Sequence, residues 1–205
     1  MIWFTSDTHF GHEVALRSCE RPWAGVGEMN DALVDAINEH VEPGDTLYHL
    51  GDYSFKMTLE DAANLRKRIS CNDVHLVPGN HDKDWAQPAV CWAFTVEKPI
   101  TVLKIGKLKL VLSHFPMADW QSMSHGSIHL PGHIHSRGMQ YNELNRMQGL
   151  HRYDVGVDAN GFRPVSLDEV LAWFDGVPCS GRVDWRNWVN ETGSKAVSRK
   201  LAGCK

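Results

Sequence analysis

The sequence predicts an α/β fold. In its first part, short apolar runs alternate with amphipathic segments in the order strand, helix, strand, helix, strand, which is typical of a parallel sheet. Each predicted strand of this part ends in polar residues, and ligands of such sheets bind beyond the carboxyl ends of the strands. The chain has 205 residues and 42% hydrophobic residues, which is enough for one domain with a well-buried core.

The elements of the first part follow from hydrophobic spacing and from helix-ending residues. In chain order they are strand 2–5, helix 28–41, strand 46–50, a helix that opens at Thr58, and strand 74–77. An apolar residue recurs every four positions in helix 28–41, at Met29, Leu33, Ile37 and Val41. Thr58 is a typical N-cap, with Asp61 three residues later.

The second part of the chain changes pattern. We expect a β-hairpin from the apolar runs 101–105 and 108–112, because the two residues between them begin with Gly106. Further strands are expected at 128–130 and 153–157, and a short helix or loop at 85–94. Ser166 and Glu169 form a capping-box pattern that predicts a last helix.

Composition separates residues 1–175 from a basic tail at 176–205. The net charge of the chain is −4, yet the tail has six basic and two acidic residues. We expect this tail to pack on the domain through Trp185 and Trp188 or to trail from it. Five scattered cysteines without a C-x-x-C pair, no secretion signal and no long apolar run favour a cytoplasmic protein without membrane spans.

Residues with metal-binding side chains follow five of the predicted strands. They are Asp7, His9, Asp52, Asn80, His81, His114, His133 and His135. Two divalent cations about 3.5–4 Å apart need a shared carboxylate and further nitrogen and oxygen ligands. Imidazole with carboxylate and no thiolate favours Mn, Fe, Zn, Ni or Co. The set therefore predicts a dinuclear metal site.

Each of these residues has a structural alternative when it is taken alone. Asp7 can cap the following helix, Asp52 can stabilise a turn, and Asn80 tolerates left-handed backbone. A histidine at the end of a strand is commonly a surface or core residue. The metal site is favoured because the alternatives require five independent coincidences, each at the end of a separate strand.

The ordered motifs resemble those of the calcineurin-like metallophosphoesterases over roughly residues 1 to 175. They are D-x-H (Asp7, His9), G-D (Gly51, Asp52), G-N-H-D (Gly79 to Asp82), S-H (Ser113, His114) and G-H-x-H (Gly132, His133, His135). The opening S-D-T-H-F-G-H and the late G-V-D are similar to a small bacterial and phage branch. The resemblance implies a four-layer α-β-β-α sandwich with two mixed sheets and a dinuclear site at the carboxyl ends of the strands.

The resemblance also implies a role for each motif. One metal would take Asp7, His9, Asp52 and His135, and the other Asp52, Asn80, His114 and His133. Mn²⁺ is favoured, with Fe, Zn, Ni and Co as alternatives. His81 would protonate the leaving oxygen of a phosphate ester. Contacts to substrate phosphate are expected from His12, Arg17 and Arg21, since arginine binds phosphate bidentately.

The second and third motifs differ from those of the protein Ser/Thr phosphatases, which resemble G-D-x-x-D-R-G and G-N-H-E. Phe55 stands where the second acid would be, and Asp82 ends the third motif. The departure argues against a protein phosphatase and leaves the partner of His81 open among Asp82, Asp84 and backbone carbonyls. The expected substrate is a small phosphodiester or phosphomonoester of nucleotide type. A nucleic-acid end-processing phosphodiesterase and a non-catalytic metal-binding scaffold are the alternatives.

Overall fold

A computed structural model describes residues 1–178, and two β-sheets form the centre of this part of the chain. The first sheet has five strands in the order β4-β3-β2-β1-β8. Their bounds are β1 Ile2–Thr5, β2 Thr46–His49, β3 Asp73–Leu76, β4 Thr95–Val96 and β8 Val165–Ser166. The four strands β1 to β4 are mutually parallel and β8 is antiparallel to β1, so the sheet is mixed.

The second sheet has three strands in the order β5-β6-β7. Their bounds are β5 Ile100–Ile105, β6 Leu108–Ser113 and β7 Ile128–Leu130. The predicted hairpin is confirmed, because Ile105 pairs with Leu108 across the turn and Gly106 has a φ of 59°. β6 and β7 are parallel, so this sheet is mixed as well.

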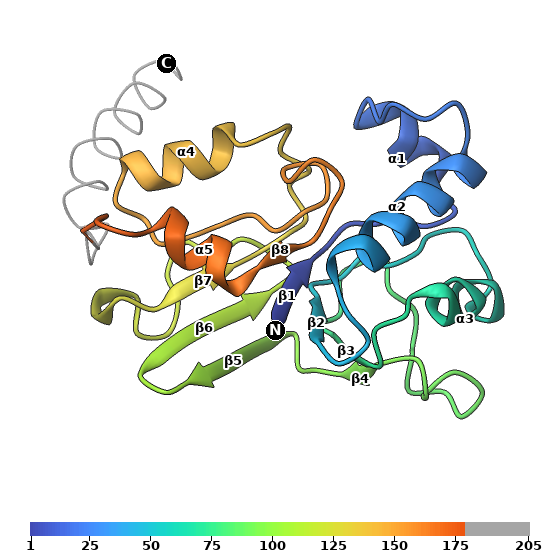
Figure 1. Cartoon of the computed structure of the whole chain (residues 1–205), viewed down its shortest axis with the longest axis horizontal. Helices are drawn as coiled ribbons and strands as arrows, with labels where there is room; N and C mark the ends of the chain where they lie inside the picture. Colours follow the sequence, from blue (N-terminus) through green and yellow to red (C-terminus); the bar gives the residue numbers. More distant parts are fainter. Residues whose placement is uncertain (179–205) are drawn as a thin grey trace, which may run out of the picture.

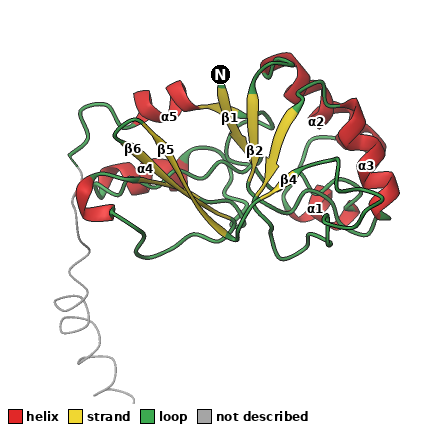
Figure 2. Ribbon diagram, turned by 90° about the horizontal axis from the view of Figure 1, so that it is seen from below, coloured by secondary structure: helices red, strands yellow, loops and turns green. Residues whose placement is uncertain are grey.

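Helices cover the sandwich on both sides, as Figure 2 shows: α2 and α3 lie on one side of the sheets and α4 and α5 on the other. The helices are α1 Glu13–Ser18, α2 Val26–His40, α3 Leu59–Arg68, α4 Gln140–Met147 and α5 Leu167–Trp173, with a 3₁₀ turn at Met123–His125. Figure 1 shows α1, α2 and α3 grouped beside the first sheet. The four-layer fold class is confirmed.

The predicted helix signals have the expected local structure. The apolar stripe of α2 is buried against the first sheet, with Leu33 1% exposed and Ile37 2% exposed. The Thr58 side chain accepts a hydrogen bond from the backbone of Asp61. Ser166 and Glu169 form a complete capping box at the start of α5. The starts of α3 and α5 and the buried face of α2 are therefore as the sequence predicted.

The prediction of a strand at 153–157 is wrong. Tyr153 N–H donates to His129 in the second sheet, whereas Val157 N–H donates to Ser6 beside the first sheet. The segment therefore crosses from one sheet to the other and makes isolated bridges instead of a continuous ladder. The short elements α1, α4, β4 and β8 were not predicted, because none has a clear hydrophobic period.

Residues 1–178 include no helix that is long and apolar enough to cross a membrane. Trp185, Trp188 and the charged residues of the expected tail lie outside the described residues. The division into a domain at 1–175 and a tail at 176–205 therefore stays a prediction.

Truncating Leu33 to alanine tests the α2 contact. We expect Leu33→Ala to lower the free energy of unfolding by about 2–5 kcal/mol, because a fully buried leucine leaves a cavity. Urea denaturation of the full chain measures this loss. The matched control is Leu144→Ala on α4, where the side chain is 51% exposed and the change should stay within about 0.5 kcal/mol. Equal losses in both variants would contradict the packing described for α2.

Candidate metal centre

The predicted ligands come together at one rim of the sandwich. They follow the carboxyl ends of β1, β2, β3, β6 and β7, and they are Asp7, His9, Asp52, Asn80, His114, His133 and His135. Two groups of three have their ligand atoms within 4.8 Å of one another. The first is Asp7, His9 and His135, and the second is Asp52, His114 and His133.

Two buried acceptor atoms of the first group face the centre without a hydrogen-bond partner. They are Oδ1 of Asp7 and Nε2 of His9. The other carboxylate oxygen of Asp7 accepts hydrogen bonds from Ser6 Oγ at 2.5 Å and His133 N at 2.8 Å. His135 Nε2 lies 3.9 Å from the free Oδ1 of Asp7. These atoms leave a polar position that a cation would satisfy.

In the second group, ligand atoms also point at one another. His114 Nε2 lies 3.0 Å from Asn80 Oδ1 and 3.2 Å from His133 Nδ1. His114 Nδ1 donates its proton to the Leu50 carbonyl at 2.9 Å, so Nε2 carries a lone pair in the neutral ring. A lone pair directed at an amide oxygen is the arrangement that a shared cation requires.

Asp52 lies between the two groups. Its Oδ2 atom is 3.4 Å from His9 Nε2 of the first group and 3.4 Å from His114 Nε2 of the second. Its Oδ1 atom accepts the backbone N–H of His81 at 2.9 Å, which fixes the carboxylate in this orientation. One oxygen is therefore placed to be shared between two cations.

Strained backbone positions these side chains. Five of the seven candidate ligands have a positive φ: Asp7 59°, His9 48°, Asp52 56°, His133 73° and His135 46°. Left-handed backbone costs about 1–3 kcal/mol at such residues and occurs mainly at functional sites. Two of the structural alternatives are wrong: Asn80 is not among the positive-φ residues, and His12, not Asp7, is the N-cap of α1.

Two glycines allow the loops to approach closely. A Cβ atom on Gly132 would lie 2.0 Å from Ser6 Oγ and 2.4 Å from Asp7 Oδ2. A Cβ atom on Gly79 would lie 2.3 Å from Asp52 Oδ1. The glycines of the G-N-H-D and G-H-x-H motifs are therefore needed for space beside the carboxylates.

Electrostatics favour the protonation state that a ligand needs at His9 and Asp52, and oppose it at Asp7, His114 and His135. Burial lowers the pKa of His9 to about 3, against the opposing effect of Asp52, so this imidazole is neutral. Burial raises the pKa of Asp52, but its hydrogen bond with His114 and the nearby histidine charges outweigh burial and lower the pKa below its usual value. Burial raises the pKa of Asp7, which has a buried oxygen without a partner.

The prediction that Arg21 contacts substrate phosphate is wrong. Its side chain is 0% exposed, and it donates to both oxygens of Asp158 at 2.9 and 3.0 Å. It also donates to the carbonyls of Thr8 at 2.8 Å and Asp7 at 2.6 Å. Arg21 therefore holds the backbone of the first motif in place and has no free donor surface.

Asp158 connects Arg21 to the candidate ligand His135. Its Oδ2 atom lies 2.7 Å from His135 Nδ1, which directs Nε2 toward Asp7. A carboxylate behind a histidine ligand fixes the tautomer and the ring orientation. Asp158 was not predicted as a site residue, and the only signal in the sequence was its place in the late G-V-D.

The other two expected substrate-binding residues, Arg17 and His12, differ in their distance from the candidate ligands. The Arg17 side chain is 78% exposed and forms an ion pair with Glu13 on the same helix. His12 Nδ1 lies 3.2 Å from His9 Nδ1, so His12 reaches the edge of the metal centre. His12 and Arg17 therefore stay predictions.

His81 packs against an aromatic ring instead of an acid. Its ring centroid is 4.4 Å from that of Phe55 and 5.5 Å from that of His9. Asp82 accepts three backbone N–H groups within the loops at 2.8 to 2.9 Å, and Asp84 accepts that of Ala86. Both carboxylates that were open as partners of His81 are thus used by backbone.

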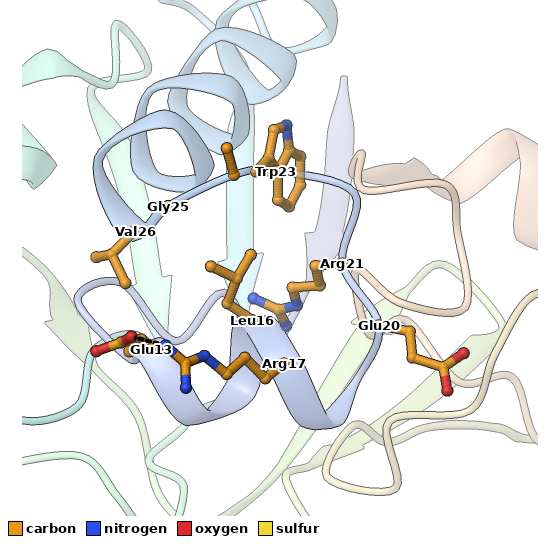
Figure 3. Close-up of a pocket in the computed structure, with 9 residues that line it drawn as sticks. Glu13, Leu16, Arg17, Glu20, Arg21, Trp23, Gly25 and Val26 are labelled. Carbon is orange, nitrogen blue, oxygen red and sulfur yellow. Dashed lines mark hydrogen bonds and ion pairs between the residues drawn. The ribbon is translucent and has the colours of Figure 1, made fainter.

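A cavity of about 540 Å³ lies beside α1 and the start of α2. In Figure 3, Leu16 lies in the middle of the lining residues, with Trp23 above it and Glu13 and Arg17 below. Arg21 is the lining residue that contacts the backbone of Asp7. None of the seven candidate ligands lines this cavity, so it neighbours the metal centre and is not part of it.

The donor set as a whole fits two divalent cations. It offers buried acceptors without partners, lone pairs that face one another and a carboxylate oxygen between the groups. His114 donates a hydrogen bond to the Leu50 carbonyl, His135 to Asp158, and the His81 backbone donates one to Asp52, so the ligands are supported from behind. Imidazole, carboxylate and amide donors suit Mn, Fe, Zn or Co.

The matched motifs and this geometry define a family. Residues 1–151 match the calcineurin-like phosphoesterase superfamily domain. The match covers well over half of the chain, and the chain therefore belongs to the calcineurin-like phosphoesterase superfamily.

Three relatives illustrate the range of similar proteins. The uncharacterized protein MJ1445 of Methanocaldococcus jannaschii is 28% identical over 83% of this chain and 89% of its own length. The Gene 66 protein of Mycobacterium phage D29 is 29% identical over 82% of this chain and 93% of its own length. The crystal structure of AQ665 from Aquifex aeolicus, a protein of unknown function, matches with a TM-score of 0.65 at 22% identity. It covers 84% of this chain and 98% of that one, which shows a common fold.

Metal uptake should release a proton from His135. Burial lowers the pKa of this residue, but the hydrogen bonds to Asp158 and Cys19 and the charge of Asp7 outweigh burial and raise the pKa to about 10. A ligating imidazole must be neutral, so affinity should rise with pH by about tenfold per unit below pH 10 for this proton. Calorimetric titration of metal-free protein with Mn²⁺ in two buffers of different ionisation enthalpy counts the protons.

Asp158→Asn is the matched variant, because an amide oxygen still accepts from Nδ1 but no longer stabilises the imidazolium. We expect about one proton fewer to be released at pH 8. The same proton count in the variant and the original chain would contradict the role given to Asp158.

Proposed function

We propose that this chain is a dinuclear-metal phosphoesterase that hydrolyses a small phosphodiester or phosphomonoester of nucleotide type, with Mn²⁺ as the favoured metal. The observation that carries the proposal is Asp52 Oδ2, at 3.4 Å from one imidazole of each ligand group. A carboxylate that serves two cations is the feature that separates a dinuclear hydrolase site from a single structural metal.

Each ligand group would hold one cation. Asp7, His9, His135 and Asp52 would hold the first, and Asn80, His114, His133 and Asp52 the second. When bound, such a pair lowers the pKa of water and neutralises charge on phosphoryl oxygens. The protein contributes the neutral imidazole of His9, the low-pKa carboxylate of Asp52 and a backbone N–H of His81 that holds this carboxylate.

His81 would move a proton at the substrate. Its Nε2 atom lies 4.0 Å from Asp52 Oδ2, and the residue is partly exposed at the edge of the metal centre. In this position His81 would protonate the oxygen of the leaving group. The edge-to-face contact with Phe55 orients the ring, since both neighbouring acids are used by backbone.

Asp52→Asn tests the shared ligand. We expect the variant to lose metal and activity together, because an amide cannot supply the anionic oxygen that both cations share. Elemental analysis of the purified protein and turnover of bis(p-nitrophenyl) phosphate with added Mn²⁺ measure the two losses. A variant that keeps two metals per chain and full turnover would reject the assignment of Asp52.

His81→Ala tests the proton donor. We expect the metal content to stay unchanged, and the rate to fall by about 10²–10⁴-fold on esters with poor leaving groups. The loss should be much smaller for p-nitrophenyl esters, whose leaving oxygen needs little protonation. Equal losses on both kinds of ester would show that His81 does not act as the acid.

A further inference from the structure

An exposed aromatic ring lies against the second ligand group. Phe115 is 50% exposed, and it directly follows His114 at the end of β6. Its ring centroid is 4.6 Å from that of His133 and 5.0 Å from that of His114. Both contacts are edge-to-face, so neither imidazole is stacked parallel on the phenyl ring.

The backbone on both sides of this ring is anchored. Ser113 Oγ donates to the Phe115 carbonyl at 2.7 Å, and Pro116 restricts Phe115 to extended backbone. Two residues later, Met117 N–H donates to Nε2 of His129 at 3.0 Å, and His129 is 0% exposed. Arg152 holds the Met117 carbonyl at 2.9 Å. The exposed ring is therefore kept at the rim by buried groups.

Phe115 and His81 lie beside different ligand groups. Phe115 contacts His114 and His133, whereas His81 lies beside His9 of the first group. The ester substituent protonated by His81 is the leaving group. The substituent that stays on phosphorus is the one that can extend toward Phe115.

We propose that Phe115 is a stacking platform for a planar, nucleobase-like group on the retained side of a phosphodiester substrate. The proposal rests on the proposed function and narrows its substrate class. An aromatic ring that faces solvent next to a phosphate site offers a π-face to any base, which is how proteins bind nucleotides without reading their sequence.

Two esters with the same leaving group test the platform. Thymidine 5′-(p-nitrophenyl) phosphate has a base on the retained side, and ethyl p-nitrophenyl phosphate has none. The measured quantity is the ratio of kcat/KM for the thymidine ester to that for the ethyl ester, in the full chain loaded with Mn²⁺. We expect Phe115→Leu to lower this ratio between roughly 5-fold and 150-fold, mainly through KM.

Conservative and distant variants supply the controls. Phe115→Trp keeps a π-face and should keep the ratio. Trp92→Leu removes another exposed ring, 51% exposed and packed against Lys67, and should leave the ratio unchanged. An unchanged ratio in Phe115→Leu, with both esters hydrolysed, would overturn the platform and leave the phosphoesterase function standing.

If neither ester is hydrolysed, binding measurements test the Phe115 platform separately from the phosphoesterase function. Calorimetry on the Mn²⁺-loaded chain compares thymidine 5′-monophosphate with ethyl phosphate. A preference for the thymidine compound that Phe115→Leu removes would support the platform and reject the phosphoesterase function. Equal affinity for both compounds in the unsubstituted chain would overturn the platform.

Discussion

The close approach of metal-binding side chains at one rim is the constraint on which the other features of this structure depend. Asp52 Oδ2 lies 3.4 Å from His9 Nε2 and 3.4 Å from His114 Nε2, and the buried atoms His9 Nε2 and Asp7 Oδ1 have no hydrogen-bond partner. Buried groups of this kind destabilise a protein unless a cation satisfies them. The surrounding structure must therefore hold these groups together against the cost of burying them.

Backbone geometry holds the ligand side chains together. Parallel strands bring the first motifs to one edge of the first sheet, and left-handed residues then turn each side chain inward. Gly79 and Gly132 let neighbouring loops come close enough to donate N–H groups to the carboxylates. Arg21, buried behind the first motif, fixes two carbonyls of the same loop. Strain at the ligands is thus offset by hydrogen bonds and packing around them.

The parts of the site that the sequence predicted are those in which chemistry follows a strand directly. Asp7, Asp52 and His114 could be recognised because each one closely follows an apolar run that predicts a strand. The pairing of Asp158 with Arg21 could not be predicted, because the two residues are 137 positions apart in the chain and no motif in the sequence links them. The segment at 153–157 was misjudged for a related reason, since alternation of apolar residues does not reveal that a chain crosses between sheets.

The replacement of an acid by Phe55 changes how the substrate side of the centre is built. A carboxylate partner would hold His81 by charge, whereas here the rings of Phe55 and His12 lie beside it. A second ring, Phe115, lies against the opposite ligand group. Aromatic surface thus borders the candidate cations at both groups, and the fixed cationic side chain expected there, Arg21, is turned away into the protein. On the proposed function, such a centre would leave charge neutralisation to the metals and would select the organic part of the ester by shape and stacking.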